Sequence, residues 1–197
     1  MHHPIEIFDD NWKKAKSLGD ANAPFCSLAT VSNTGQPSVR TLVLRGVTED
    51  SFVIFIDETS PKWDHLKHSK QFELLVFWPS LMQQYRIRGE LSELSFRTME
   101  SHWAKKPYDS KMLDHYYVEV QPQTSPVNSR ETLLADIDAL QKRYPADQDI
   151  PCPTSAKGIS IKAAYIETWH SSDSDRLHKR HLYLLCEGQW ERQVLVP

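Results

Sequence analysis

Three short segments place cationic side chains inside stretches that are otherwise apolar. They are residues 40–45 (RTLVLR), residues 84–89 (QYRIRG) and residues 176–180 (RLHKR). A guanidinium binds phosphate or carboxylate through paired hydrogen bonds, and it stacks on planar rings. Together the segments predict sites for anionic, planar ligands. A solvent-exposed strand surface also explains each segment taken alone.

Strand alternation predicts which of these side chains share a face. Arg40 and Arg45 are five residues apart, so they point to opposite faces of an ideal strand and could serve two anionic groups. In the second segment three polar side chains alternate with apolar ones and share a face: Gln84, Arg86 and Arg88. The third segment, if it is extended, also places three side chains on one side: Arg176, His178 and Arg180.

Several common chemistries have no motif in this chain. The 6 glycines stand far apart, so neither GxGxxG nor GxxxxGK[ST] can be written, and a phosphate must be held by Arg, Lys and hydroxyl side chains. HExxH and GxSxG are also missing. His65 and His68 lie three apart on a predicted helix, where a solvated face is favoured over a metal pair. We therefore predict no metal site.

Length and composition fit one globular domain spanning residues 1–197. The chain is 40% hydrophobic and 25% charged, and its net charge of −3 gives no general attraction to nucleic acid or to an anionic membrane. The 3 cysteines lack a CxxC pair and are read as reduced thiols. No apolar run approaches the roughly 20 residues that cross a bilayer. We expect a cytoplasmic protein with no membrane or nucleic-acid partner.

The elements that must position the cations are mainly strands. Apolar and β-branched runs predict strands at residues 25–31, 38–45, 51–56, 72–78, 83–94, 159–169, 180–186 and 190–196. The short connection at residues 46–50 makes its two flanking strands an antiparallel pair. Many strands with a few helices between them indicate an α+β fold, built on an antiparallel sheet or barrel.

Helices are predicted at the N-terminus, ending near Gly19, and at residues 61–69, 96–106, 110–119 and 129–144. Ser60 is the expected cap of the second of these, with Pro61 at its first position. Asn128 and Glu131 match a capping box for the last helix. That helix carries four apolar residues on one face, which we expect to dock on the barrel: Leu133, Ile137, Leu140 and Tyr144. The loop at residues 145–156 is not expected to separate domains.

The motifs taken in order resemble the pyridoxamine 5′-phosphate oxidase family. RTLVLR, an SPK turn, QxRxxG, KPxDS and ETW…RLHKR follow one another as in that family, from about Phe25 to Pro197. The resemblance implies a split β-barrel with flanking helices that binds FMN. It also implies a homodimer with sites at the interface, which oxidises pyridoxamine or pyridoxine 5′-phosphate to pyridoxal 5′-phosphate with oxygen as acceptor.

The resemblance also implies roles for individual residues. The cofactor contacts it implies are Arg40, Thr41, Leu42, Val43, Ser60, Lys62, Gln84, Gln123, Trp169 and Arg180. The substrate contacts it implies are Arg45, His102, Lys106 and Ser110 for the substrate phosphate, with Arg176 and His178 over the pyridine ring. The last two are also the catalytic residues that the resemblance implies.

The chain departs from the family pattern at three of the four phosphate contacts, and Pro61 replaces an arginine in the SPK turn. Each replaced phosphate contact can still donate hydrogen bonds, but Lys and Arg grip phosphate differently. Two alternatives therefore stay open. One is a related flavin reductase or oxidase that acts on another small molecule. The other is a binder of FMN, haem or pyridoxal phosphate that catalyses nothing.

Overall fold

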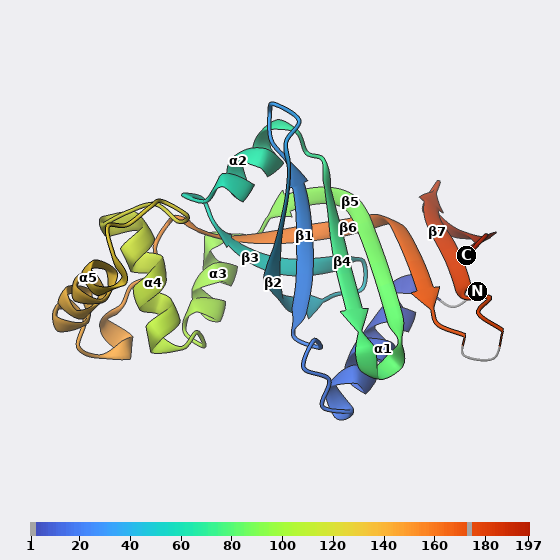
Figure 1. The fold of residues 1–197 in the computed structure, drawn as a ribbon, viewed down its shortest axis with the longest axis horizontal. Helices are drawn as coiled ribbons and strands as arrows, with labels where there is room; N and C mark the ends of the chain where they lie inside the picture. Colours follow the sequence, from blue (N-terminus) through green and yellow to red (C-terminus); the bar gives the residue numbers. More distant parts are fainter. Residues whose placement is uncertain (1–2, 173–174) are drawn as a thin grey trace.

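One antiparallel sheet organises the chain, and its strands curl until two of them meet. The computed structural model describes residues 3–172 and 175–197. The strands follow the order β3-β2-β1-β4-β5-β6-β7-β8, and an added β3–β6 pairing closes β1 to β6 into a barrel (Figure 1). Their bounds are β1 Phe25–Val31, β2 Pro37–Val47, β3 Ser51–Asp57, β4 Phe72–Trp78, β5 Gln83–Glu93, β6 Ala156–His170, β7 Lys179–Cys186 and β8 Gln189–Leu195. The expected α+β split barrel is confirmed.

Alternation along the strands fills the barrel with apolar side chains. In β5, Tyr85 and Ile87 are buried while Arg86 and Arg88 lie on the outer face, as the pattern predicted. The N-terminal helix α1 (Pro4–Ser17) covers one end of this core. Its Phe8 is fully buried and contacts three aromatic rings: Phe52, Trp78 and Tyr85. This helix ends at Ser17, two residues before Gly19 and near the predicted end.

The remaining helices are α2 (Pro61–His68), α3 (Phe96–Trp103), α4 (Tyr108–Glu119) and α5 (Arg130–Arg143), with 3-10 turns at Pro79–Leu81 and Asp147–Asp149. The helices α3, α4 and α5 stand beside the barrel, on the side away from β7 (Figure 1). They enclose a second apolar cluster of buried residues: Trp103, Met112, Tyr116, Leu140 and Ile150. This helical cluster is separate from the core of the barrel.

Two expectations for α5 were wrong. Its apolar face packs into the helical cluster against α4, not onto the barrel, because an apolar stripe specifies burial but not the partner. Its N-cap is Ser129, whose Oγ accepts a hydrogen bond from the Thr132 amide at 3.2 Å, so Asn128 is not the cap. Ser60 does occupy the N-cap position of α2, but its hydroxyl donates to the Asp57 carbonyl at 2.6 Å instead of capping.

Two strands are irregular where the alternation is interrupted. The register of β2 against β3 shifts between Leu44 and Gly46, which places one extra residue, Arg45, in β2. The register of β5 against β6 shifts between Arg88 and Gly89. A Cβ added at Gly89 would lie 1.9 Å from the Lys162 carbonyl oxygen, so the backbones approach too closely there for any other residue.

No helix in the two described ranges is long and apolar enough to span a bilayer. The same ranges contain no cluster of three or more His, Cys, Asp or Glu side chains placed to hold a metal. His65 shares a hydrogen bond with the Thr30 hydroxyl at 2.9 Å, and His68 with the Asp64 carbonyl at 2.7 Å. Both histidines of the predicted helix therefore have local structural partners.

Candidate functional site

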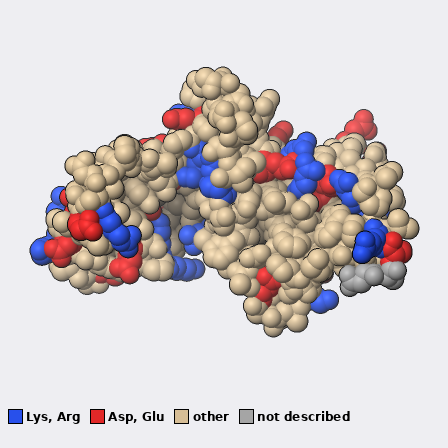
Figure 2. Space-filling view, in the orientation of Figure 1, with Lys and Arg blue, Asp and Glu red and all other residues tan. Residues whose placement is uncertain are grey.

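A cavity of about 280 Å³ lies where the barrel meets α3 and α4. Its charged and polar lining residues are Arg45, Asp57, Lys62, His102, Lys105, Lys106, Asp114, Tyr117 and Gln123. Figure 2 shows Lys and Arg side chains around the hollow between the helices and the barrel. Three of the four predicted phosphate contacts line this cavity: Arg45, His102 and Lys106. Ser110 does not line it; this residue is half-buried in the first turn of α4.

The bulge in β2 decides where Arg45 points. Arg45 lines the same cavity as Leu42, although ideal alternation puts residues three apart on opposite faces. Arg40 does not line this cavity, so the prediction that the two arginines could serve two different anionic groups remains a prediction. The Arg45 guanidinium lies over the Phe55 ring, 5.2 Å from its centroid. Phe55 in turn meets the His102 ring edge-on at 5.0 Å, so a stack of three side chains forms one wall.

Arg40 sits at the β1–β2 ladder and donates only to uncharged oxygens. Its Nη1 reaches the Leu28 carbonyl at 3.0 Å and the Thr30 hydroxyl at 2.7 Å, and its Nη2 reaches the Ser38 hydroxyl at 2.8 Å. Nearby, the buried Lys62 donates from Nζ to Gln123 Oε1 at 2.7 Å. Within the described ranges neither cation forms an ion pair with a carboxylate.

Burial and repulsion leave Lys62 only weakly basic. Burial and the charge of Arg40, opposed by the charge of Asp57, together lower the pKa of Lys62 to about 8. Burial also lowers the pKa of Arg40. Two cations that repel each other across a partly buried space, with no carboxylate bound to either, form a site that an anion would stabilise. We call Arg40 and Lys62 the anion cradle.

A hydrogen-bond chain ties the anion cradle to the segment between α4 and α5. The Gln123 amide donates to the Thr59 hydroxyl at 3.2 Å, and that hydroxyl donates to Asp57 Oδ1 at 2.6 Å. Ser155 donates to the other oxygen of Asp57 at 2.8 Å. Gln123 is thereby fixed with its side-chain oxygen on Lys62. The other predicted cofactor contacts on β2 follow the ladder: Thr41 pairs with Ser27, Leu42 with Cys26, and Val43 with Phe25.

A second group of predicted residues lies together on β5, β6 and β7. Gln84 pairs with Trp169 across β5 and β6, and Trp169 pairs with Arg180 across β6 and β7. The His178 ring lies 4.8 Å from the Trp169 ring, inclined at 51°. The Ser172 amide donates to His178 Nδ1 at 3.2 Å. Four of the predicted residues thus form one aromatic and cationic patch.

Arg176 departs from its expected geometry. It has a φ of +59°, in the left-handed region, so residues 176–180 are not one extended segment, and the condition for the predicted shared side is not met. Asp175 causes the turn: its Oδ1 accepts from the Leu177 amide at 2.9 Å and from the Ser172 hydroxyl at 2.5 Å. Arg176 is exposed at the tip of this turn.

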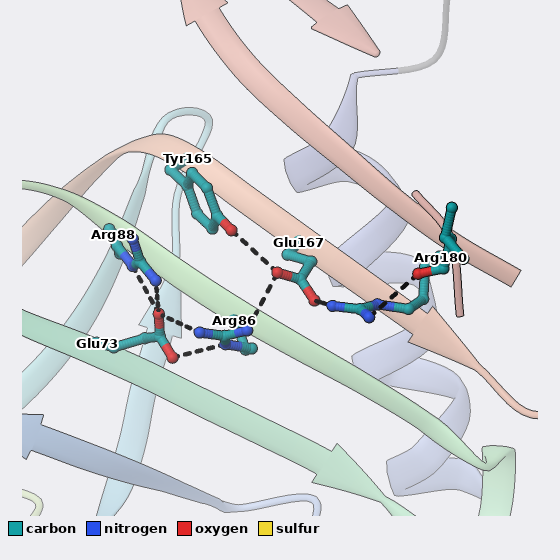
Figure 3. A network of polar contacts seen from close by, with 7 residues as sticks. Glu73, Arg86, Arg88, Tyr165, Glu167 and Arg180 are labelled. Carbon is teal, nitrogen blue, oxygen red and sulfur yellow. Dashed lines mark hydrogen bonds and ion pairs between the residues drawn. The ribbon is translucent and has the colours of Figure 1, made fainter. Parts of the chain in front are cut away.

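Arg180 is held by a charged network that the sequence analysis missed (Figure 3). Its Nη2 donates to Glu167 Oε1 at 2.6 Å, and Arg86 donates to Glu167 Oε2 at 3.2 Å. Arg86 and Arg88 both bind Glu73 on β4, each at 2.6 Å through Nε. Burial raises the pKa of Glu167, but hydrogen bonds from Arg180 and Tyr165 outweigh it and hold that pKa below its usual value. One signal was available, because Glu167 interrupts the apolar strand AAYIETW.

The two groups of predicted residues stay apart within one chain. The cavity and the anion cradle lie on the side of α3 and α4. Trp169 and Arg180 lie on β6 and β7, toward the other end of the long axis, and His178 directly precedes β7 (Figure 1). Among the residues described, one copy does not bring all the predicted contacts around one ligand. That separation is the main geometric finding about the predicted site.

Comparison with known proteins gives consistent results. Residues 5–95 match the family model described as pyridoxamine 5′-phosphate oxidase, FMN-binding domain. A pyridoxine/pyridoxamine 5′-phosphate oxidase of Cytophaga hutchinsonii is 33% identical over 91% of this chain and 81% of its own length. One from Deinococcus deserti is 31% identical over 98% of this chain and 89% of its own length.

Two solved structures share the fold. PhzG from Burkholderia lata, in complex with tetrahydrophenazine-1-carboxylic acid, superposes with a TM-score of 0.87 over 99% of this chain and 93% of its own, at 22% identity. A pyridoxamine 5′-phosphate oxidase-related, FMN-binding protein from Nostoc punctiforme superposes with a TM-score of 0.78 over the full length of both chains, at 18% identity.

Proposed function

Because the chain belongs to the pyridoxamine 5′-phosphate oxidase family, a family of FMN-binding oxidoreductases, we propose that it oxidises pyridoxamine or pyridoxine 5′-phosphate to pyridoxal 5′-phosphate with oxygen as electron acceptor. The observation that carries this proposal is the anion cradle with the cavity directly beside it. Such a pair of sites suits a cofactor phosphate and an adjoining anionic substrate.

The residues present fit FMN. Arg40 and Lys62 would hold the cofactor phosphate. Its negative charge would pair with these two cations, whose pKa values are lowered by burial. The buried Ser60 is two residues from Lys62 at the start of α2, and Gln123 is already fixed by Thr59. When bound, FMN supplies the acceptor for a hydride from the substrate carbon. Everything else required of this site is binding and orientation by the chain's own side chains.

On the substrate side, Arg45 would bind the anionic group of the substrate, with its guanidinium held in place by Phe55. His102 and Lys106 lie on the same cavity and can each donate a hydrogen bond. Ser110 would need to turn its hydroxyl toward the cavity, since it does not line it. Arg176 and His178 would position the pyridine ring and stabilise charge that develops during hydride transfer.

We further propose that two copies assemble the complete site. The cavity group and the Trp169 group lie on different sides of one chain, so a two-fold pair could bring the cradle of one copy against Trp169 and Arg180 of the other. The turn with Arg176 at its tip is exposed and would reach the partner's cavity. A sedimentation measurement tests this directly, because a monomer that binds FMN with full affinity would contradict it.

The activity test uses purified FMN-loaded protein. With pyridoxamine 5′-phosphate, oxygen and water it should form pyridoxal 5′-phosphate, ammonia and hydrogen peroxide in equal amounts. Arg176→Ala should abolish this turnover and leave FMN bound, whereas Arg130→Ala, at an exposed arginine of α5, should change neither. Well-folded holoprotein that gives no product would reject the proposed substrate. An Arg176→Ala variant with normal turnover would reject the assigned role.

A second candidate is an FMN-dependent oxidoreductase that acts on a different small anion. The observation that favours it is the carboxylate of Asp114 inside the cavity, which forms an ion pair with Lys106. Rapid bleaching of the flavin by NADH or NADPH, together with no oxidation of pyridoxamine 5′-phosphate, would select this reading. A protein that binds FMN but shows neither reaction would be a binder only.

A further inference from the structure

One acidic side chain faces the part of the cavity where the substrate anion is expected. Asp114, on α4, lines the cavity beside Arg45 and Lys106, and its carboxylate forms an ion pair with Lys106. The side chains of Asp114 and Lys106 are 15% and 19% exposed, so the pair is largely shielded from water. Burial raises the pKa of Asp114, and the charge of Lys106 opposes that rise.

Asp114 acts on two cations of that region, Lys106 and Arg45. It neutralises Lys106 directly, and its negative charge partly offsets the effect of burial on the pKa of Arg45, which burial lowers. The remaining cation on this side, Lys105, is exposed. The cavity therefore presents much less positive charge to a ligand than its count of Lys and Arg indicates.

We infer that Asp114 is a specificity-determining residue, which sets how strongly this cavity prefers a doubly charged anionic group over a singly charged one. With Asp114 and Lys106 paired, a carboxylate or a singly ionised phosphate ester is accepted nearly as well as a phosphate dianion. This inference rests on the proposed function, because it takes the cavity to be the substrate site of the FMN-dependent oxidase.

The physical reason is that Coulomb energy scales with the charge of the ligand. A fixed negative charge repels a dianion twice as strongly as a monoanion at the same place, and it does not repel an uncharged ligand. Removing the charge of Asp114 also frees Lys106 to bind the ligand. The ratio between the effects on the two anions is therefore a signature that a purely structural change would not produce.

The test is calorimetric titration of FMN-loaded wild-type protein and Asp114→Asn at pH 8, with three ligands. Pyridoxine 5′-phosphate carries two negative charges on its phosphate at this pH, pyridine-3-carboxylate carries one, and pyridine-3-carboxamide carries none. Each ligand is compared with itself across the variants, so differences in ring shape cancel. Asp114→Glu keeps the charge, and Asp109→Asn removes an exposed carboxylate from the same helix.

Asp114→Asn should tighten binding of the monoanion about tenfold and of the dianion about a hundredfold, with the uncharged ligand within about twofold. Asp114→Glu and Asp109→Asn should both behave as wild type. Equal shifts for all three ligands, or no shift for the dianion, would overturn the inference. The readout is binding, so its outcome does not depend on turnover. Absence of pyridoxamine 5′-phosphate oxidation would contradict the proposed function, whereas only the titrations can contradict the role of Asp114.

Discussion

The weak basicity of Lys62 makes FMN binding dependent on pH in a range where the ligand itself does not change. With a pKa of about 8, Lys62 is charged in about 90% of molecules at pH 7 and about 10% at pH 9. A bound phosphate dianion favours the charged ammonium, so binding raises this pKa. The affinity for FMN is therefore highest well below pH 8, and it falls as the pH rises through the pKa of Lys62. We expect the dissociation constant of FMN to increase about tenfold from pH 7 to pH 9, or about 1.4 kcal/mol.

The assay is quenching of flavin fluorescence by the apoprotein between pH 7 and pH 9. The second ionisation of a phosphate monoester lies near pH 6, so FMN stays a dianion throughout. Lys62→Arg should bind FMN with a flat pH profile, because a guanidinium keeps its charge over this range. Riboflavin, which has no phosphate, should bind wild-type protein with little pH dependence. If Lys62→Arg and wild type showed the same slope, Lys62 would not be the titrating group and the anion cradle would be misassigned.

The remaining predictions concern stability and are checked by chemical denaturation. Glu167→Gln leaves Arg180 without a carboxylate partner, whereas Arg86 keeps Glu73. It should cost about 1–3 kcal/mol, below the roughly 3–5 of a fully buried pair, because the side chains of Arg86 and Arg180 are 32% and 29% exposed; a cost under about 0.5 kcal/mol would contradict the network. The Cβ of Gly89→Ala would meet the Lys162 carbonyl, whereas that of Gly158→Ala would meet side-chain atoms of Met99 and Leu94 at 2.5 and 2.8 Å. Gly89→Ala should therefore lower the free energy of unfolding more than Gly158→Ala. The reverse order would mean that the bulge is not rigid. Met112→Ala empties part of the helical cluster and should cost about 2–5 kcal/mol, and FMN should remain bound if the barrel core is independent of it.

Sequence reasoning located the strands, the helices and most side-chain faces of this protein because those follow from local periodicity. The outer face of β5, with Arg86 and Arg88, is an example, since alternation with buried Tyr85 and Ile87 fixes it within one strand. Position 60 as the cap of α2 is another, because Pro61 marks the first turn. The family resemblance supplied the split barrel and FMN, which no local pattern could.

What the sequence did not reveal depends on geometry between distant residues or on single irregular positions. The face of Arg45 depends on a bulge, and the conformation of Arg176 depends on the hydrogen bond that the Leu177 backbone amide donates to the Asp175 carboxylate. Glu167 and Arg86 are 81 positions apart and meet only because β5 pairs with β6. Asp114 is one of three acidic residues on α4, and nothing near it in sequence indicates that it faces a cavity while Asp109 is exposed.

The two separate cores have a consequence for how such a protein can diversify. The anion cradle is attached to the barrel, whereas Lys106 and Asp114 belong to the helical part, and the cavity lies along the seam between them. Changes that accumulate in α3 and α4 can reshape what enters the cavity while the flavin support stays intact. Descendants of one scaffold could then exchange substrates without first losing their cofactor.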